Sequence, residues 1–430
     1  MADDDELPSG RIGRSARIGG LVAGQSLRWA GTRLANRRRT DADADAARAA
    51  CALATADEIV TALGQMKGAA MKFGQVLSMA DFEGLPEPER EQFKAKLAAL
   101  RDAAPSVPFA KMRKLVEQDL GGPLSAFFAA FDETPVAAAS IGQVHRARTL
   151  DGADVAVKVQ YPGVAEAVEA DLRNAGLLLP LVKRMAPALD AKALLAELRE
   201  RVGEELDYEL EAQHQRTVAR AFRDHPFVVV PAVHTALSAR RVLTTDFVEG
   251  AGFEAVKALG QAERDRFGEI LFRFYFGLLH REHLAAGDPH PGNVLLCAGG
   301  RVCFVDFGLM RRVPAVYLDG ERRLTRAMRS GDADGVHAAM SELGYLPEPD
   351  TFDPQELLDQ LNGEPSRELM RRQTIPPESM LIRRMEMLLF RALADLDARA
   401  DWSALGRELR GGPPAGTELG DAEAAWLRRR

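Results

Sequence analysis

The sequence predicts an α+β fold with two lobes, preceded by a helical extension. Helical periodicity dominates residues 47–130 and returns after Gly250, whereas apolar residues alternate with a period of two in several runs between them. The length of 430 residues suits one two-lobed protein, because a domain takes about 100–200 residues. We therefore divide the chain into a flexible or amphipathic basic segment (1–46), a helical extension (47–130), a mixed lobe (131–249), a helical lobe (250–410) and a tail (411–430).

The composition is that of an ordinary globular protein. Hydrophobic residues make up 46%, charged residues 28%, and the net charge is −7. These values exclude a disordered, collagen-like or disulfide-scaffold chain, and we expect no nucleic-acid partner. The three cysteines form no CxxC pair and predict no zinc site. The longest apolar run, 175–182, is far shorter than the ~18–20 residues of a membrane span, so we expect no transmembrane helix. The N-terminus starts acidic and lacks a basic region leading into an apolar stretch, so we expect no secretory signal and a cytoplasmic chain peripheral to the membrane.

Residues 11–40 contain eight arginines and no acidic residue. Trp29 and several aliphatic residues lie among these arginines, so the segment could form a helix that binds an anionic membrane surface. A disordered basic tail is the alternative, because the glycines of the segment weaken a helix. Composition alone leaves both readings open.

The elements that follow are predicted from their periodicity. We expect helices at about 42–80, 88–102 and 109–120, and a hairpin in which Val144 and Val155–Val159 flank a turn at Asp151-Gly152. Helices at 164–185 and 191–223 and strands at 227–230 and 242–247 complete the mixed lobe. The helical lobe is interrupted by one strand pair, 294–296 and 302–305.

Four pieces in this order bear residues suited to phosphoryl transfer. They are a small-residue loop at 137–142, Lys158 on a strand, Asp288 with Asn293 five positions later, and Asp306-Phe307-Gly308 after a strand. Such a lysine neutralises nucleotide phosphates, an Asp positions or deprotonates the acceptor, and an Asn and a second Asp hold magnesium. Each piece alone is weak, but together they predict a protein-kinase-like fold that binds ATP and Mg²⁺.

The chain departs from ordinary protein kinases at several points. Ala286-Gly287 stands where His-Arg would precede the catalytic Asp, and no Ala-Pro-Glu follows Asp306. A helix near 317–328 follows too soon for a peptide-docking platform, and the nucleotide loop has alanines where glycines are usual.

In these departures the chain resembles the UbiB/AarF family of atypical kinases, which includes the mitochondrial coenzyme Q kinases. Lys72-Phe73-Gly74-Gln75 looks like the KxGQ motif of that family, and residues 137–145 look like its alanine-rich loop. Glu205-Leu206-Asp207 fits its ExD motif. The motifs cover about residues 55–310, and the likeness extends more loosely to about 400.

The resemblance implies a role for each matching residue. Lys158 would bind the nucleotide phosphates beside the loop residues Ala137, Ala138, Ala139 and Ser140. Asp288 would be the catalytic Asp, and Asn293 and Asp306 the metal ligands. Glu205 would pair with Lys158 or Lys72, with Asp207 in the same regulatory contact, while Lys72, Gly74 and Gln75 would belong to an inhibitory cover. The segment with Asp246 and Val248 looks like the hinge that holds adenine.

Simpler interpretations exist for several of these residues. His290 could structure its loop instead of binding a metal, Lys72 could be a solvated helix lysine, and Glu205 lies in an acidic run that could simply face solvent. The aromatic run 271–276 is more typical of core packing than of a lipid groove, and Cys297 and Cys303 are expected to be inert core residues.

The resemblance implies an ATPase or atypical kinase with little protein kinase activity in trans. It would support isoprenoid quinone (ubiquinone) biosynthesis at a membrane surface, with quinone precursors or quinone-biosynthesis enzymes as partners. A phosphotransferase of the aminoglycoside-kinase type, which shares the Asp-x-x-x-x-Asn loop, and a nucleotide-binding scaffold without turnover are the alternatives.

Overall fold

The structure is a computed structural model that describes residues 11–64, 107–139, 141–185, 202–363 and 372–430. Residues 90, 92–93, 96, 195–196, 199 and 369 are also described. The chain forms two compact units, each of which is considered by itself. Unit 1 comprises residues 1–209 and 235–244, and unit 2 comprises residues 210–234 and 245–430.

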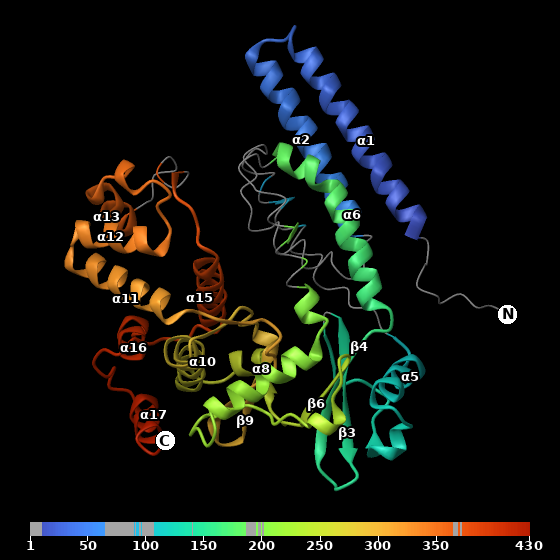
Figure 1. The fold of residues 1–430 in the computed structure, drawn as a ribbon, viewed down its shortest axis with the longest axis vertical. Coiled ribbons are helices and arrows are strands. Elements are labelled where there is room, and N and C mark those ends of the chain that lie inside the picture. The colour runs from blue at the N-terminus through green and yellow to red at the C-terminus, as the bar shows by residue number, and fades with distance from the viewer. Residues whose placement is uncertain are drawn as a thin grey trace, which may run out of the picture. The chain divides into compact units, whose positions relative to one another are not determined.

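Three long helices of unit 1 lie side by side (Figure 1): α1 (Arg11–Asn36), α2 (Asp41–Gly64) and α6 (Val164–Met185). The apolar core between them includes Ile59 of α2 and Leu178 of α6, both fully buried. Three polar side chains of this core contact one another. Trp29 Nε1 donates to Thr55 Oγ1 at 3.0 Å, and the Thr55 hydroxyl lies 3.3 Å from Gln25 Oε1.

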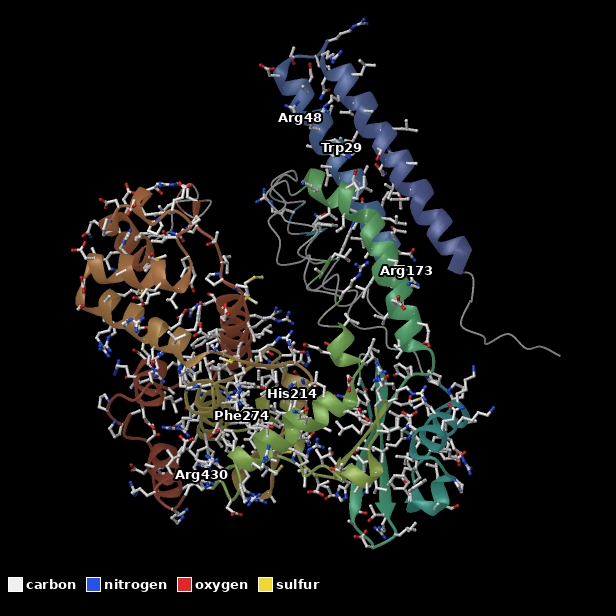
Figure 2. The ribbon with its side chains drawn as sticks, viewed as in Figure 1. Trp29, Arg48, Arg173, His214, Phe274 and Arg430 are labelled. Atoms are coloured by element: carbon white, nitrogen blue, oxygen red, sulfur yellow. The ribbon has the colours of Figure 1, made fainter. Side chains whose placement is uncertain are left out.

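Of the two alternatives for the N-terminal segment, a helix and a disordered basic tail, the structure supports the helix. Residues 11–36 are helical, and Trp29, which the membrane hypothesis placed among the lipid-facing residues, points toward α2 (Figure 2). The outward face of α1 instead carries Leu27 and Leu34, which are 74% and 66% exposed. Gly20, Gly24 and Gly31 have open space around them, so the helix forms because its other face is buried.

The sheet of unit 1 has the strand order β1-β3-β4-β6, with β2 paired to β3. The strands are β1 (Phe128–Phe131), β2 (Ala137–Ala138), β3 (Gly142–Thr149), β4 (Asp154–Gln160) and β6 (Val242–Asp246). The predicted hairpin is confirmed, because β3 and β4 pair antiparallel in unbroken register from Gly142↔Gln160 to Arg148↔Asp154. Val155, Val157 and Val159 are fully buried against α5 (Phe109–Leu120) and its neighbours.

Unit 2 is organised around α10 (Gln261–Glu282). Its aromatic residues are buried, and the ring of Phe274 (labelled in Figure 2) stacks on Phe304 with centroids 3.6 Å apart. This packing confirms the core-packing interpretation of residues 271–276. Among the residues that the structure describes, this unit contains most of α8 (Tyr208–Ala221), together with α9 (Phe253–Lys257), α10, α11 (Ala315–Ser330), α12 (Ala333–Leu343), α13 (Pro354–Asn362), α15 (Pro377–Asp395), α16 (Trp402–Leu409) and α17 (Glu418–Leu427).

Two small sheets accompany these helices. One has the order β5-β10-β9-β7, with strands β5 (Val228–Val229), β7 (Ala251–Gly252), β9 (Val294–Cys297) and β10 (Arg301–Phe304). The pairing of β9 with β10 confirms the expected strand pair. The other sheet, β8 (Leu284–Ala286) with β11 (Met310–Arg312), was not foreseen from the sequence. Cys297 and Cys303 are free and buried, as expected.

The C-terminal residues differ from the expected tail because a buried ion-pair network holds them. Arg273 of α10 is fully buried and bonds Glu269 at 2.7 Å, Glu408 at 2.8 Å and Glu423 at 2.9 Å. Burial alone would raise the pKa of Glu423, but hydrogen bonds from His225 and Arg281, with the charges of Arg281 and Arg273, lower it to about 2. Helix α17 is therefore part of the core, with Trp426 packed against His225.

The boundary between the units also differs from the predicted lobe boundary at residue 249. Helix α8 begins in unit 1 and continues into unit 2, where Val218 and Phe222 join the core around α10. The expected continuous helix 191–223 is interrupted at Leu206-Asp207, where residues 202–205 end one helical segment and α8 starts. Within the described residues, no helix is both long and apolar enough to cross a membrane.

Candidate functional site

Lys158 lies on β4, where the strand faces β3 opposite Val144. Its side chain alternates to the face away from Val157 and Val159, as the period of two requires, and it is half-buried. The ammonium group lies 5.0 Å from the centre of the Tyr208 ring, within the range of a cation–π interaction. The lysine is thus held by the hairpin and by the first residue of α8, both in unit 1.

The alanine-rich loop begins on β2. Ala137 and Ala138 pair with Val144 and Gln143, and the amide of Ala139 donates to the carbonyl of Gly142 at 2.8 Å. Ala137 and Ala138 are exposed, as a loop that approaches a ligand requires. Gly142 has no room for a side chain, because a Cβ there would lie 2.3 Å from the carbonyl oxygen of Val159. Ser140 lies outside the described residues.

The ExD segment precedes α8. Asp207 accepts a hydrogen bond from the amide of Glu209 at 3.1 Å and so caps the helix start. Gln160 at the end of β4 donates to the carbonyl of Leu206 at 2.9 Å, which ties this segment to the Lys158 strand. Glu205 is half-buried between these contacts. Its pairing with Lys158 or Lys72 stays a prediction, and Lys72, Gly74 and Gln75 lie outside the described residues.

In unit 2, the β8–β11 pair brings the two predicted acidic segments together. The strands are antiparallel, with Ala286 opposite Met310, so the residues that follow β8 adjoin those that precede β11. The amide of Gly287 donates to the carbonyl of Leu309 at 2.9 Å. Asp288 therefore starts its loop beside the end of Asp306-Phe307-Gly308.

The loop from Asp288 to Asn293 is organised by its own histidine. His290 Nδ1 accepts the amide of Gly292 at 3.0 Å, and the His290 carbonyl accepts the amide of Asn293 at 2.9 Å. The amide of Val305 then donates to the carbonyl of Asn293 at 3.1 Å, which connects this loop to the residue before Asp306. The loop-structuring interpretation of His290 is confirmed.

Helix α8 contributes two further residues next to the Asp-Phe-Gly segment. His214 Nδ1 contacts the carbonyl oxygen of Phe307 at 3.1 Å. Glu211 is 2% exposed, and its Oε2 lies 3.8 Å from where a Cβ of Gly308 would stand. The amide of Gly308 donates to Asp306 Oδ1 at 3.0 Å, so the carboxylate of Asp306 is oriented by its own turn.

Helix α15 holds the other side of the Asp288 loop. Arg384 Nε donates to the carbonyl oxygen of Gly287 at 3.1 Å. A Cβ on Gly287 would lie 2.6 Å from the side chain of Leu309 and 2.7 Å from that of Leu381. The residue before Asp288 is therefore glycine because two leucine side chains pack against its Cα.

The two aspartates share one electrostatic environment. Tyr275 of α10 is fully buried; burial raises its pKa, and the negative charges of Asp288 and Asp306 raise it further. A phenol beside two carboxylates stays protonated. The pairing of β8 with β11 brings the two segments that contain these aspartates next to each other.

The predicted hinge follows β6. The carboxylate of Asp246 accepts the amide of Ala232 at 3.1 Å and contacts His234 Nε2 at 2.8 Å. The side chain of Asp246 thus holds the neighbouring loop, and Val248 is half-buried. A hinge contacts adenine through backbone groups, so this role of the side chain leaves the prediction open.

The donor set fits magnesium. Asp306 and Asn293 offer carboxylate and amide oxygens, which hard cations prefer. Among the described residues, no group of three or more His, Cys, Asp and Glu is placed to hold a metal ion. In phosphoryl-transfer sites, Mg²⁺ usually binds one or two protein carboxylates together with substrate phosphates and water.

A strand lysine, an Asp-x-x-x-x-Asn loop and an Asp-Phe-Gly segment define a protein of the kinase-like class. Residues 99–340 match the family model "ABC1 atypical kinase-like domain". The chain belongs to this family, and the predicted family resemblance and kinase-like fold are confirmed. The match includes Lys158, Asp288, Asn293 and Asp306 but begins after Lys72.

Curated relatives and a solved structure agree with this assignment. The chain is 32% identical to rat atypical kinase COQ8B, mitochondrial, over 79% of this chain and 64% of the relative. It is also 32% identical to the Arabidopsis thaliana chloroplastic protein ACTIVITY OF BC1 COMPLEX KINASE 8, over 60% and 35%. The solved complex of Rv3197 with erythromycin from Mycobacterium tuberculosis has a TM-score of 0.60 and 32% identity, covering 83% of this chain and 97% of that one. The chain spans less than two thirds of the two curated relatives.

Sequence reasoning missed the residues that hold the acidic loops. His214 and Arg384 are 93 and 97 residues from the carbonyls that they contact. Glu211 was not singled out from the sequence. A glutamate three positions before a histidine, a spacing that puts both on one helix face, was the available signal for this part of α8.

Proposed function

We propose that the chain is an atypical kinase or ATPase that binds Mg-ATP. The observation that carries this proposal is the β8–β11 pairing, which brings the segment that contains Asp288 next to the segment that contains Asp306 in unit 2. Asp288 would position or deprotonate the acceptor, Asp306 and Asn293 would hold the metal, and Lys158 would bind phosphate oxygens. The bound magnesium would neutralise charge on the phosphates.

ATP hydrolysis by purified full-length protein tests this proposal. Asp288→Asn and Asp306→Ala should each reduce Mg-dependent hydrolysis by roughly a hundredfold or more. Asp334→Asn, at an exposed position of α12, is the matched control and should hydrolyse ATP like the wild type. Equal rates in wild type and Asp288→Asn would remove Asp288 from the catalytic role.

We further infer a role in isoprenoid quinone biosynthesis, with little phosphorylation of other proteins. Support comes from the relatives named as COQ8 atypical kinases and from the short connection between Gly308 and α11. Quinone profiling of a strain lacking the gene tests the role. Complementation with wild type should restore the quinone pool and Asp306→Ala should not. An unchanged pool in the deletion strain would contradict the inference.

We also propose that the protein acts at an anionic membrane surface through α1. Leu27 and Leu34 are seven residues apart on the outward face, and Arg28, Arg33, Arg37 and Arg38 are exposed around them. Such a face suits a helix lying in the interfacial region. The double variant Leu27→Ser/Leu34→Ser should bind anionic liposomes more weakly, whereas Leu177→Ser, at an exposed position of α6, should bind like wild type. Salt should weaken binding.

A second candidate is the phosphorylation or binding of a small molecule in the manner of an aminoglycoside kinase. The observation that favours it is the solved relative in complex with erythromycin. Incubation with Mg-ATP and a panel of macrolides and aminoglycosides, followed by mass spectrometry, would reveal a phosphorylated product. Wild type should form it and Asp288→Asn should not; no product and no saturable binding of any member would exclude this function.

A further inference from the structure

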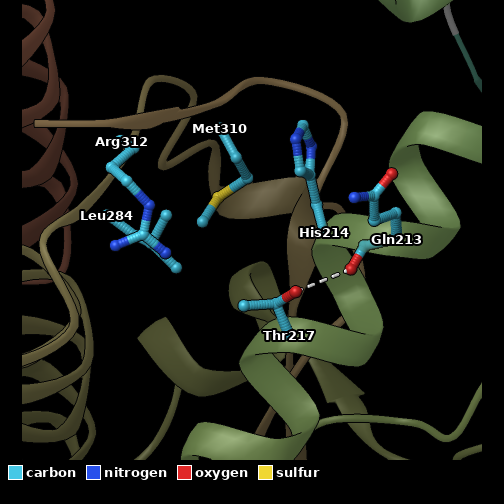
Figure 3. A pocket seen from close by; sticks show the side chains of 6 residues that line it. All are labelled: Gln213, His214, Thr217, Leu284, Met310 and Arg312. Atoms are coloured by element: carbon cyan, nitrogen blue, oxygen red, sulfur yellow. Dashed lines mark hydrogen bonds between the residues drawn. The ribbon is translucent and has the colours of Figure 1, made fainter.

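A pocket of about 190 Å³ lies in unit 2 between α8 and the β8–β11 pair. Gln213, His214 and Thr217 line it from α8, and Leu284, Met310 and Arg312 line it from the two strands (Figure 3). Because a closed cavity of about 150 Å³ holds benzene, this partly open pocket has room for a six-membered ring with one side toward solvent. None of the six residues belongs to the set predicted for ATP or magnesium.

The strand side of the pocket combines an apolar wall with one cation. Leu284 and Met310 are 7% and 4% exposed, so their side chains present little surface except toward the pocket. Arg312 is exposed, and among the residues that the structure describes its guanidinium makes no ion pair or hydrogen bond. Because Met310 and Arg312 are two positions apart on β11, their side chains lie on the same face of the strand.

The α8 side is polar. The Thr217 hydroxyl donates to the carbonyl oxygen of Gln213 at 2.9 Å, as the dashed line in Figure 3 marks, so this hydroxyl can offer a ligand only an acceptor. His214 contacts Phe307 through Nδ1, and because a carbonyl only accepts, Nδ1 carries the proton. Charge, apolar contact and hydrogen-bonding groups therefore meet in one small space.

The pocket is connected to the Asp-Phe-Gly segment by two of its walls. His214 lines the pocket and also contacts the carbonyl of Phe307. Met310 follows Gly308 by two residues, and the intervening Leu309 accepts the hydrogen bond from Gly287. A ligand against His214 and Met310 would therefore contact the same short stretch of chain that positions Asp306.

We propose that this pocket binds a small organic carboxylate with a flat apolar body, and that binding changes the affinity of the protein for Mg-nucleotide. A carboxylate matches Arg312, because a guanidinium can bind it through two parallel hydrogen bonds. An aromatic ring matches Leu284 and Met310, because a thioether sulfur makes favourable contacts with rings. The coupling to nucleotide rests on the proposed function, whereas the binding of the carboxylate does not.

Benzoate is a suitable probe, and calorimetric titration of the full-length protein measures its binding. Benzoate should bind saturably at one site. Benzyl alcohol keeps the ring without the charge, and acetate keeps the charge without the ring. The affinity for each should be lower than that for benzoate by about tenfold or more. Equal affinity for benzoate and acetate would indicate a nonspecific anion effect and overturn the proposal, as would the absence of saturable benzoate binding.

Two neighbouring arginines provide matched variants. Arg312→Gln should lose about tenfold or more in benzoate affinity, because one charge-assisted contact is removed. Arg311→Gln, on the opposite face of the same strand, should bind benzoate like the wild type. Arg312→Lys keeps the positive charge but loses the two parallel donors of the guanidinium. Its benzoate affinity should lie between those of Arg312→Gln and Arg311→Gln. Equal affinities of Arg312→Gln and Arg311→Gln, with both thermal unfolding midpoints unchanged, would place the benzoate elsewhere.

The coupling is measured as Mg-nucleotide affinity with and without saturating benzoate. The wild type should change by about threefold or more, and Arg312→Gln should not change, because coupling between two sites is reciprocal. Benzoate binding that depends on Arg312 but leaves nucleotide affinity unchanged would overturn the coupling. If the protein binds no nucleotide under any condition, the proposed function fails, and the benzoate titration still decides whether the pocket is a carboxylate site.

Discussion

The strand with Lys158 and the strand pair beside Asp288 and Asp306 are held in place by different kinds of contact. Strands β3 and β4 are joined by a turn of four residues and pair over seven positions, with Val155, Val157 and Val159 buried beneath them. Strands β8 and β11 pair over three positions and are separated by 23 intervening residues. Arg384 and His214, from distant parts of the chain, fix the loops of the second pair.

The difference shows that local sequence positions the lysine strand of unit 1, whereas tertiary packing positions the acidic loops of unit 2. A hairpin forms from neighbouring residues, and its register follows from its turn and its alternating apolar residues. The β8–β11 pair must first bring distant segments together, so it depends on α8, α10 and α15 being packed. Substitutions in these supporting helices should therefore affect the acidic loops far more than the lysine strand.

The largest expected effect comes from breaking the ion-pair network of α10, the helix that leads directly into β8. Glu423→Ala should lower the free energy of unfolding by about 3–5 kcal/mol, because it leaves Arg273 buried without one of its carboxylates. Chemical denaturation followed by circular dichroism measures this change. The control Glu254→Ala removes a carboxylate that is 83% exposed and should cost about 1 kcal/mol or less. Similar losses in both variants would show that the network does not anchor α10.

A smaller effect is expected from adding one methyl group at Gly142, within the β3–β4 pair, or at Gly287, next to the β8–β11 pair. Gly142→Ala should cost about 1–3 kcal/mol or more, because its Cβ would meet the backbone oxygen of Val159, which the β3–β4 ladder fixes. Gly287→Ala should cost less, because its Cβ meets leucine side chains that can shift. Thermal unfolding measures both, with Gly31→Ala at an exposed position of α1 as a control that should not destabilise. The reverse order would contradict the distinction between a local and a packed strand pair.

The contact between Arg384 and Gly287 should matter for activity more than for stability. Arg384→Met keeps the apolar stem of the side chain but removes the hydrogen bond, and should cost about 1 kcal/mol of stability. Because the Asp288 loop loses a support, we expect kcat for ATP hydrolysis to fall about tenfold with KM for ATP nearly unchanged. Arg383→Met is the control, since Arg383 pairs with Glu321 and Glu386 at the surface. Equal kcat values in the two variants would exclude a positioning role for Arg384.

The last effect, which appears only in acid, distinguishes two buried histidines. His145 of β3 has partners in Gln143 and Asp132, whereas the ring nitrogens of His280 of α10 have none among the described residues. Burial, with the charges of Arg410, Arg322, His283 and Arg281, lowers the pKa of His280 to about 3. In the unfolded chain this imidazole binds a proton below about pH 6.5, whereas in the folded protein it stays neutral. The free energy of unfolding should therefore be about 1.4 kcal/mol lower at pH 5.5 than at pH 7.5.

Chemical denaturation at several pH values measures this loss. His280→Phe should flatten the profile between pH 7.5 and 5.5 more than His145→Gln does. Burial lowers the pKa of His145, but its contact with Asp132 raises it, so the two effects partly cancel. His145 should therefore contribute less than His280 to the pH dependence of stability. Identical profiles for wild type and His280→Phe would show that another group titrates in this range.

The features that the sequence predicted correctly depend on neighbouring residues. The β3–β4 hairpin, the β9–β10 pair and helix α11 all follow from periodicity and turns within short windows. The loop-structuring role of His290 is likewise contained in six residues. Family membership was predictable because the motifs are ordered along the chain, although their catalytic roles stay predictions.

The features that were not foreseen depend on long-range packing. Helix α17 is short and follows a Gly-Gly-Pro-Pro sequence, and nothing near it indicates that Glu423 will meet Arg273, 150 residues earlier. The outward direction of Leu27 and the inward direction of Trp29 depend on α2, which covers one face of α1. The β8–β11 pair consists of two three-residue segments, too short for a reliable period-two pattern.

The contact of Arg384 with Gly287 also bears on how the protein can be shortened. A fragment limited to residues 99–340, the region that matches the family model, would contain Lys158, Asp288, Asn293 and Asp306. It would lack Arg384 and Leu381, which hold the residue before Asp288, as well as Glu408 and Glu423, which neutralise Arg273. A truncated protein with all of these motif residues would therefore be without the supports of its acidic loop, and minimal fragments should extend through α17.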